Sequence, residues 1–191
     1  MKRNNIIANQ HTYSSVINAL GTGGQWERAL EILNQMKEKG MNVNVVTYNS
    51  AINALAKASR DGKSDVDRGQ LWIKALELLD QMKSERVWPD KYTYSSIIAC
   101  CASGARYQEA IDLIQTMRDG PAKIRPNTLN YTGAITACAR AGEWSHALRL
   151  FNDMKSDGIK CDVVTYNALV SAYMNGGKPD MVSQELLLSS I

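Results

Sequence analysis

Short polar side chains recur at one place along the chain, directly after a tyrosine. They are Ser14, Asn49, Ser95, Thr132 and Asn167. A hydroxyl group can both donate and accept a hydrogen bond, and an amide offers a separate donor and acceptor. A plain solvent-facing helix would favour Ala, Glu, Lys or Gln there, because Ser, Thr and Asn have poorer helix propensity. The pattern therefore predicts a recognition role, suited to the Watson–Crick edge of an unpaired nucleobase.

A second polar series stands where one segment of the chain ends and the next begins. Its members are Asn9, Asn44, Asp90, Asn127 and Asp162. Two interpretations are open. Asn and Asp just before a helix act as N-caps, which accept hydrogen bonds from free backbone N–H groups. The same side chains also carry donors and acceptors that suit a nucleobase, so they are candidate partners of the residues after the tyrosines.

Apolar or flat side chains occupy a third place, two residues before each tyrosine. They are His11, Val46, Tyr92, Leu129 and Val164. Such groups suit stacking against bases, and ordinary packing against a neighbouring repeat explains them equally well. No nucleophile or carboxylate stands near His11 in the sequence, so a catalytic role is not expected for it.

These series recur because the chain is built of repeats. The tyrosines are Tyr13, Tyr48, Tyr94, Tyr131 and Tyr166, at spacings of 35, 46, 37 and 35 residues. A second pattern runs in step with them, in which an aromatic residue is followed ten positions later by a methionine: Trp26 and Met36, Trp72 and Met82, Tyr107 and Met117, Trp144 and Met154. Both patterns carry apolar residues at three- and four-residue spacing, as amphipathic helices do. Each repeat is therefore expected to form a helix A, a short turn and a helix B.

The repeat boundaries follow from this alignment. The expected repeats are 10–44, 45–90, 91–127, 128–162 and an incomplete 163–191, after residues 1–9, which match the end of a preceding repeat. The expected helices are 10–22, 25–39, 45–58, 71–85, 91–103, 106–118, 128–140, 143–156, 163–175 and 179–189. Eleven extra residues, rich in Gly, Ser and Asp, predict an exposed loop near 59–70. Two more lie near Gly120 and Pro121.

A helix pair of this size cannot bury its apolar face alone, so neighbouring pairs must stack. We expect an all-α fold, a right-handed α-solenoid (superhelix) of stacked helix-turn-helix hairpins forming one array over residues 1–191. Small residues mark the expected close contacts: Ala19, Ala54, Cys100, Ala137 and Ala172 on helix A, and Ala29, Ala75, Ala110 and Ala147 on helix B. The aromatic and methionine stripes are interpreted as packing residues.

The composition narrows the classes of partner. A net charge of +3 permits a polyanionic partner without requiring one. The four cysteines, Cys100, Cys101, Cys138 and Cys161, form no Cys-x-x-Cys or Cys/His cluster, so no metal site or cofactor is predicted and reduced thiols are expected. No apolar run reaches membrane-spanning length, so no membrane partner is expected.

The repeat resembles the pentatricopeptide repeat family, in its 35-residue type. Val163-Val-Thr-Tyr-Asn-Ala-Leu-Val and Val45-Val-Thr-Tyr-Asn-Ser-Ala-Ile are near-consensus openings. Met154-Lys-Ser-Asp-Gly-Ile-Lys-Cys-Asp162 departs from the usual close at Cys161, where proline is common. The resemblance covers the whole chain except the 59–70 segment and the last helix.

The resemblance implies a partner and a location. Proteins of this family typically bind organellar RNA and govern its processing, stability, editing or translation. The expectation is therefore sequence-selective binding of single-stranded RNA, in a mitochondrion or chloroplast, with one base read by each repeat. The family places the residues two before each tyrosine on either side of a base. Phosphate contacts are expected from cations near the end of helix A, namely Lys57 and Arg140.

The resemblance also implies a base order. In the family, the residue after the tyrosine sorts base size and the closing residue sorts the base edge. Carried over, the pairs are Ser14 with Asn44 for A, Asn49 with Asp90 for U, Ser95 with Asn127 for A, and Thr132 with Asp162 for G, while Asn167 suggests a pyrimidine. The predicted preference is therefore 5′-A-U-A-G-(U/C)-3′.

The ends of the sequence carry two further expectations. Residues 1–9 align with 36–44 inside a repeat, which favours a piece of a longer protein whose targeting segment is not visible here. Apolar helix surface at an end without a capping neighbour, including Leu186, Leu187 and Leu188, predicts weak self-association.

Two other classes of function compete with RNA binding. The first is a protein-binding scaffold of the tetratricopeptide type, which has a 34-residue period. The second is an enzyme. The sequence holds no metal-ligand cluster, Ser/His/Asp constellation or phosphate-binding glycine loop, so no catalysis is expected of this chain. Some relatives carry a nuclease or deaminase domain beyond the repeats.

Overall fold

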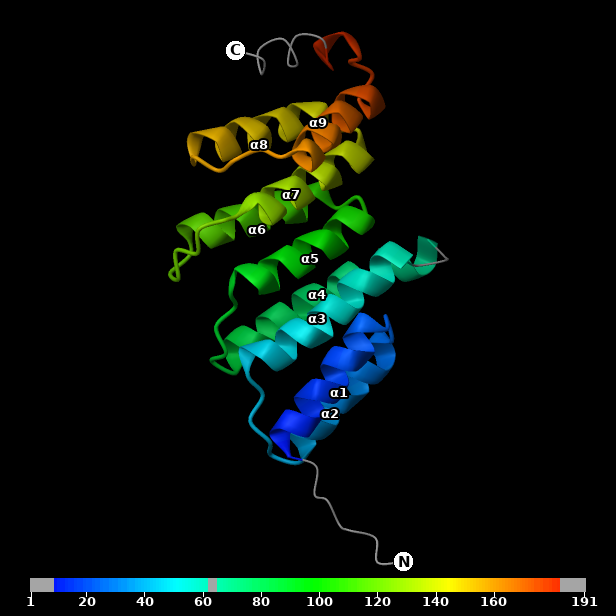
Figure 1. Ribbon diagram of the computed structural model, residues 1–191, viewed down its shortest axis with the longest axis vertical. Coiled ribbons are helices and arrows are strands. Elements are labelled where there is room, and N and C mark those ends of the chain that lie inside the picture. Colours follow the sequence, from blue (N-terminus) through cyan, green and yellow to red (C-terminus); the bar gives the residue numbers. More distant parts are fainter. Residues whose placement is uncertain (1–8, 62–64, 183–191) are drawn as a thin grey trace, which may run out of the picture. The chain divides into compact units, whose positions relative to one another are not determined.

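The computed structural model describes residues 9–61 and 65–182, and within them it is helical without a strand (Figure 1). The chain divides into two compact units, Met1–Pro89 and Asp90–Ile191. This division falls at the predicted junction between the second and third repeats. Each unit is described by itself below.

The first unit consists of two helical hairpins. Its helices are α1 (Gln10–Thr22), α2 (Trp26–Glu38), α3 (Val45–Asp61) and α4 (Asp65–Ser84). The helices α1 and α3, which are helix A of successive repeats, pack side by side. The helix α2 packs against both of them, and α4 packs against α3.

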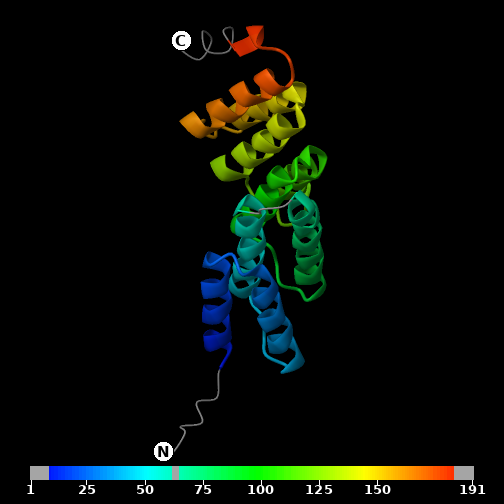
Figure 2. The ribbon, with the colours of Figure 1, turned by 90° about the vertical axis from the view of Figure 1, so that its right-hand side faces the viewer.

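The second unit repeats the same arrangement. Its helices are α5 (Lys91–Ser103), α6 (Tyr107–Asp119), α7 (Thr128–Ala141), α8 (Trp144–Ser156) and α9 (Val163–Asn175). The helix A series α5, α7 and α9 forms one layer, while α6 packs on α5 and α7, and α8 packs on α7 and α9 (Figure 2). The stacked helix-turn-helix architecture expected of an α-solenoid is confirmed in each unit.

The helix contacts are formed by the predicted small residues. Ala54, Cys100, Ala137 and Ala172 are each fully buried, and so are the four helix B alanines. The close approach of α1 and α3 leaves so little space that a Cβ on Gly21 would lie 2.8 Å from the Ser50 carbonyl oxygen. Ala19 is the exception, because it is exposed on α1.

The methionine and aromatic stripes also pack as predicted. Met36, Met82, Met117 and Met154 are each fully buried. The aromatic residues of the helix B pattern, Trp26, Trp72, Tyr107 and Trp144, are half-buried. Burial raises the pKa of Cys101 and of Cys138 to about 12, so these thiols have little nucleophilic character.

The predicted loop near 59–70 is wrong in its extent. The helix α3 continues to Asp61 and α4 begins at Asp65, so most of the inserted residues lengthen the two helices. Ser59 is buried and donates a hydrogen bond to the carbonyl of Ala56 within α3. Extending a helix that is already packed adds one backbone hydrogen bond per residue, which outweighs the turn preference of Gly, Ser and Asp. The helix expected at 179–189 lies outside the described residues after Val182.

The pattern tyrosines join consecutive repeats through a carboxylate and a cation. In the first unit the Tyr48 hydroxyl donates to Glu85 at 2.7 Å, and Lys37 of the preceding repeat donates to both groups at 2.6 and 2.8 Å. In the second unit the Tyr131 hydroxyl donates to Asp157 at 2.6 Å, while Arg118 lies 3.5 Å from the same carboxylate. The link ties the start of one helix A to the ends of two helices B.

Removing the charge from this link should destabilise the first unit in a pH-dependent way. Burial acts to raise the pKa of Glu85, but hydrogen bonds from Lys37 and Tyr48 outweigh it and lower the pKa. This stabilisation is present above the ordinary pKa of a glutamate and is lost as pH falls through the lowered value. We expect Glu85→Gln to lower the melting temperature by a few degrees at pH 7, with a difference from wild type that shrinks towards pH 3.

The control for that measurement is Asp80→Asn. Asp80 pairs with Lys83 at 3.9 Å, and its side chain is 82% exposed, so this surface pair should contribute little. An equal loss of stability in both variants, or a Glu85→Gln loss that is independent of pH, would contradict the proposed role of the link.

Candidate nucleic-acid interface

The closing residues are N-caps in the structure. The Oδ1 atom of Asn9, Asn44, Asp90, Asn127 and Asp162 accepts from the backbone N–H three residues later in every case. The backbone N–H groups at the start of each helix A are otherwise unpaired, so this bond fixes where the helix begins. The capping interpretation is confirmed, and it occupies one of the two terminal atoms of each side chain.

The residue after the tyrosine is joined to the next repeat. In the first unit, the Ser14 hydroxyl lies 2.7 Å from the Thr47 hydroxyl, and Thr47 donates to Asn44 Oδ1 at 3.0 Å. Thr47 is buried, so this contact is shielded from water. A single bridging side chain thus brings Ser14 and Asn44 together, which are the two residues predicted to read the first base.

The second unit shows the same bridge twice. The hydroxyls of Thr132 and Thr165 lie 2.8 Å apart, and Thr165 donates to Asp162 Oδ1 at 2.7 Å. In the repeat before, Asn130 replaces threonine, and its amide donates to Ser95 Oγ at 2.9 Å. Its backbone N–H donates to Asn127 at 3.0 Å. The predicted third and fourth pairs are therefore brought together as well.

The remaining predicted base-reading residues are Asn49, Asp90 and Asn167. Asn167 is exposed on α9, and Asn49 is half-buried on α3. Asp90 caps α5 by accepting from Tyr92 and Thr93 at 2.9 Å. Asn49 and Asp90 belong to different units, so their pairing stays a prediction. Backbone and then hydroxyl hydrogen bonds from Thr165 hold the pKa of Asp162 below its ordinary value, so this carboxylate is an anion at neutral pH.

The predicted stacking residues are exposed at the start of each helix A. Val46, Tyr92, Leu129 and Val164 are 62%, 59%, 64% and 61% exposed. His11 is exposed too. Side chains this exposed have most of their surface available to a partner, and base stacking by them stays a prediction.

An open cavity of about 520 Å³ lies at the first of these positions. It is lined by Asn9, Gln10, His11, Ser14, Asn44 and Val46. The predicted first base-reading pair, Ser14 and Asn44, and the two side chains expected to hold the base, His11 and Val46, thus share one cavity. We call each such arrangement of a predicted base-reading pair between two predicted stacking residues a slot.

Each of the two predicted phosphate-contacting cations donates a hydrogen bond to a backbone carbonyl of the preceding helix A. Lys57 donates to the carbonyl of Thr22, and Arg140 donates to the carbonyl of Ser103 at 3.4 Å. Asn175 stands at the same place in the fifth repeat and donates to Ala139 at 2.8 Å. All three bonds end on the last turn of the preceding helix A, where carbonyl groups lack partners within the helix. A phosphate contact by Lys57 and Arg140 stays a prediction.

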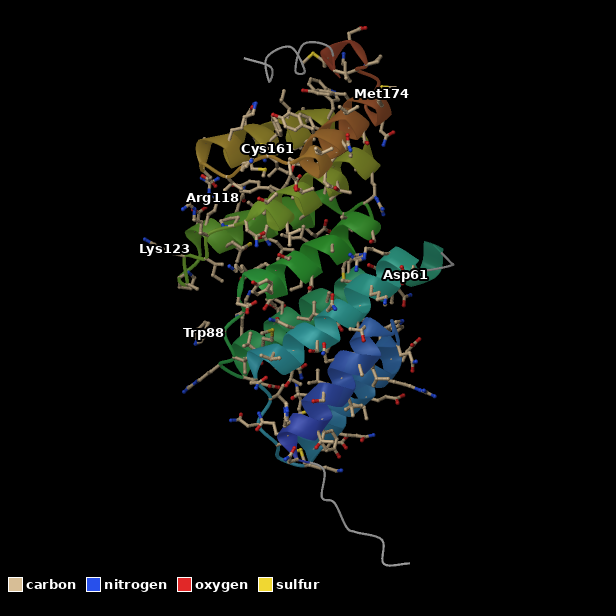
Figure 3. The ribbon with its side chains drawn as sticks, viewed as in Figure 1. Asp61, Trp88, Arg118, Lys123, Cys161 and Met174 are labelled. Atoms are coloured by element: carbon tan, nitrogen blue, oxygen red, sulfur yellow. The ribbon has the colours of Figure 1, made fainter. Side chains whose placement is uncertain are left out.

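Other cations gather beside the turn before α7. Arg118, Lys123, Ile124, Arg125, Pro126 and Asp157 line a cavity of about 280 Å³. Figure 3 shows Arg118 and Lys123 at one end of α6. Arg125 donates to the Asp157 carbonyl at 2.7 Å, and Arg118 pairs with its carboxylate. Arg118 and Arg125 therefore take part in the link between repeats.

The sequence analysis missed the bridging residues Thr47, Asn130 and Thr165. Their signal was present, because the position directly before each tyrosine is threonine in four repeats and asparagine in one. A polar side chain that is buried needs a hydrogen-bond partner, but burial is not visible in the sequence. The described residues contain no cluster of His, Cys, Asp or Glu that could hold a metal ion. None of the described helices is both long and apolar enough to span a membrane.

Stacked two-helix repeats with polar pairs at the starts of the helices A define a helical-repeat protein. A family model described as the pentacotripeptide-repeat region of PRORP matches residues 1–186. The chain therefore belongs to the pentatricopeptide repeat family. Among the curated proteins compared with the chain, none matches significantly.

Solved structures share the fold. The pentatricopeptide repeat protein PPR10 from maize is 26% identical with a TM-score of 0.69, covering 96% of this chain and 24% of its own. PPR10 in complex with an 18-nt psaJ RNA element is 24% identical with a TM-score of 0.73, and the match covers 98% of this chain and 29% of PPR10. The PPR domain of Arabidopsis thaliana protein-only RNase P 1, solved with tRNA, is 17% identical with a TM-score of 0.74. The match covers 91% of this chain and 84% of that domain. The chain thus spans less than a third of the length of PPR10.

Proposed function

We propose that this chain binds single-stranded RNA, with one base held in each slot. The observation that carries the proposal is the first slot, where Ser14 and Asn44 line one cavity with the two exposed side chains His11 and Val46. A flat base fits between two such groups, while the polar pair faces its edge. The RNA complexes of PPR10 and of the RNase P 1 repeat domain support the same partner class.

The proposal includes the base order 5′-A-U-A-G-(U/C)-3′. It further includes a non-catalytic role in organellar RNA processing, stability, editing or translation, within a mitochondrion or chloroplast. One feature supports the base assignments physically. The cap engages Oδ1 of the closing residue and leaves Nδ2 of Asn44 as a donor, or Oδ2 of Asp162 as an acceptor. A donor suits the N1 of adenine, and an acceptor suits the N1–H of guanine.

The test is a binding titration with fluorescent oligonucleotides. We expect A-U-A-G-U to bind more tightly than its reversed sequence. The slope of log K against log salt should be about −1 to −2, because two phosphate-contacting cations release about 0.7 ions each on single strands. Equal binding of all sequences would contradict base reading, and absence of RNA binding at low salt would contradict the whole proposal in favour of a peptide-binding scaffold.

We also propose weak self-association through exposed apolar surface near the C-terminal end. Leu186, Leu187 and Leu188 lie outside the described residues. On α9, Val163 and Met174 are 74% and 58% exposed. Sedimentation at increasing concentration should show a rising average mass, and a constant monomer mass would contradict this proposal.

A further inference from the structure

The direction of the hydrogen bonds in the fourth slot is fixed by chemistry. Thr165 Oγ1 lies 2.7 Å from Oδ1 of Asp162, and an ionised carboxylate only accepts. The single hydroxyl proton of Thr165 is therefore committed to Asp162. The 2.8 Å contact between the hydroxyls of Thr132 and Thr165 then requires Thr132 to be the donor. The lone pairs of Thr132 are what remain for a ligand.

The hydrogen bonds of the first slot run in the same direction. The Asn44 Oδ1 atom accepts from the backbone N–H of Thr47 at 3.0 Å, which identifies it as the amide oxygen. The Thr47 hydroxyl donates to this oxygen at 3.0 Å. Ser14, which lies 2.7 Å from Thr47 Oγ1, must therefore donate to it. Ser14 is left with lone pairs for a ligand, as Thr132 is.

The third slot differs because Asn130 stands where the other two slots have threonine. The Asn130 amide donates to Ser95 Oγ at 2.9 Å, so Ser95 is the acceptor in the bridge. The Ser95 hydroxyl donates to the carbonyl of Lys91 at 2.8 Å, within its own helix. Rotating this hydroxyl towards a ligand breaks no bond between repeats. Ser95 can therefore donate to a ligand or accept from it.

We infer that Thr47, Asn130 and Thr165, each directly before a tyrosine, are positioning residues, which set whether the hydroxyl of the preceding slot accepts or donates. Thr47 and Thr165 hold Ser14 and Thr132 as acceptors, whereas Asn130 leaves Ser95 free to do either. This inference rests on the proposed RNA binding. The fourth slot then presents two acceptors, Thr132 Oγ1 and Asp162 Oδ2, to a base. Guanine matches them, because N1–H and the exocyclic N2 amino group are adjacent donors on its Watson–Crick edge.

The test is Thr165→Val, which keeps the side-chain shape and the backbone N–H that caps to Asp162. Without an acceptor beside it, the Thr132 hydroxyl can turn either way. We expect the preference for A-U-A-G-U over A-U-A-A-U to fall about tenfold, the size of one hydrogen bond of about 1.4 kcal/mol. Binding of oligonucleotides with an abasic fourth position should change less than twofold. Thr165→Ser retains the hydroxyl and should restore the preference.

Two further variants complete the test. Thr116→Val is the control, because the Thr116 hydroxyl donates only to the Asp112 carbonyl within α6. It should leave the preference unchanged. Asn130→Thr tests the inference at the third slot, so its result does not depend on whether the Thr165 variant folds. It makes Ser95 a fixed acceptor. The preference for A-U-A-G-U over A-U-G-G-U should therefore increase severalfold.

The outcomes separate the inference from the function beneath it. If wild type discriminates at the fourth base and folded Thr165→Val discriminates equally, the inference is overturned while RNA binding stands. An unchanged third-base preference in Asn130→Thr overturns it as well. If wild type binds none of the oligonucleotides, the proposed function and the inference both fall.

Discussion

Asp162→Asn should change the preferred fourth base from guanine to adenine. The substituted side chain keeps an oxygen for the Thr165 N–H, so the cap that begins α9 is retained. Its other atom becomes an Nδ2 donor in place of an Oδ2 acceptor. With Thr132 still an acceptor, the slot then matches the N6 amino group and the N1 of adenine. A good side chain–base pair discriminates by about ten- to a hundredfold, so the ratio of affinities for A-U-A-G-U and A-U-A-A-U should invert.

A charge-matched control is available for that experiment. Asp119→Asn removes the same charge from an exposed position at the end of α6, a helix that contributes no residue to a slot. It should raise affinity for both oligonucleotides equally and slightly, by reducing repulsion of the phosphates. If Asp162→Asn behaves in the same way, with no change in the ratio, then Asp162 is a cap and does not read a base.

Phe151→Ala should be the most destabilising change in the second unit among those considered. Phe151 is fully buried on α8, and its ring meets the Tyr166 ring of α9 edge-on at 5.2 Å. Deleting a buried aromatic ring leaves a cavity and costs about 3–5 kcal/mol. For a chain of this length we expect a fall in melting temperature of roughly 10 °C, measured by circular dichroism at 222 nm.

The matched control is Met174→Ala, which also shortens a large apolar side chain but at a position 58% exposed on α9. Exposed substitutions of this kind change stability by about 0.5 kcal/mol or less. A Phe151→Ala protein as stable as Met174→Ala would mean that α8 and α9 do not pack in solution as described here.

Much of the fold follows from comparing the chain with itself. The helices α1, α5 and α9 begin and end at the predicted residues, because an Asn or Asp cap and a following glycine flank each of them. The small residues and the methionines were placed in the core because equivalent positions must meet equivalent neighbours in a stack. Periodicity therefore carries most of the architecture.

The site was predictable in its positions but not in its bonds. Ser14, Ser95 and Thr132 stand out in the sequence as poor helix formers, and the structure shows each one joined to the following repeat. That contact spans 33 or 35 residues, so no local pattern reveals it. The prediction that Lys57 and Arg140 contact phosphates follows from the family resemblance alone. Their bonds to the carbonyls of Thr22 and Ser103 depend on how closely two helices approach.

The hydrogen bonds from Lys57, Arg140 and Asn175 each lead back to an earlier helix A, and this direction affects how the protein completes its repeats during synthesis. Lys57, Arg140 and Asn175 each complete the helix A that lies 35 to 37 residues earlier. A ribosome releases the chain from its N-terminus at about 5–20 residues per second. Each newly made hairpin therefore waits a few seconds without this bond to its last turn, until the next one emerges. The order of translation is thus also the order in which the repeats become complete.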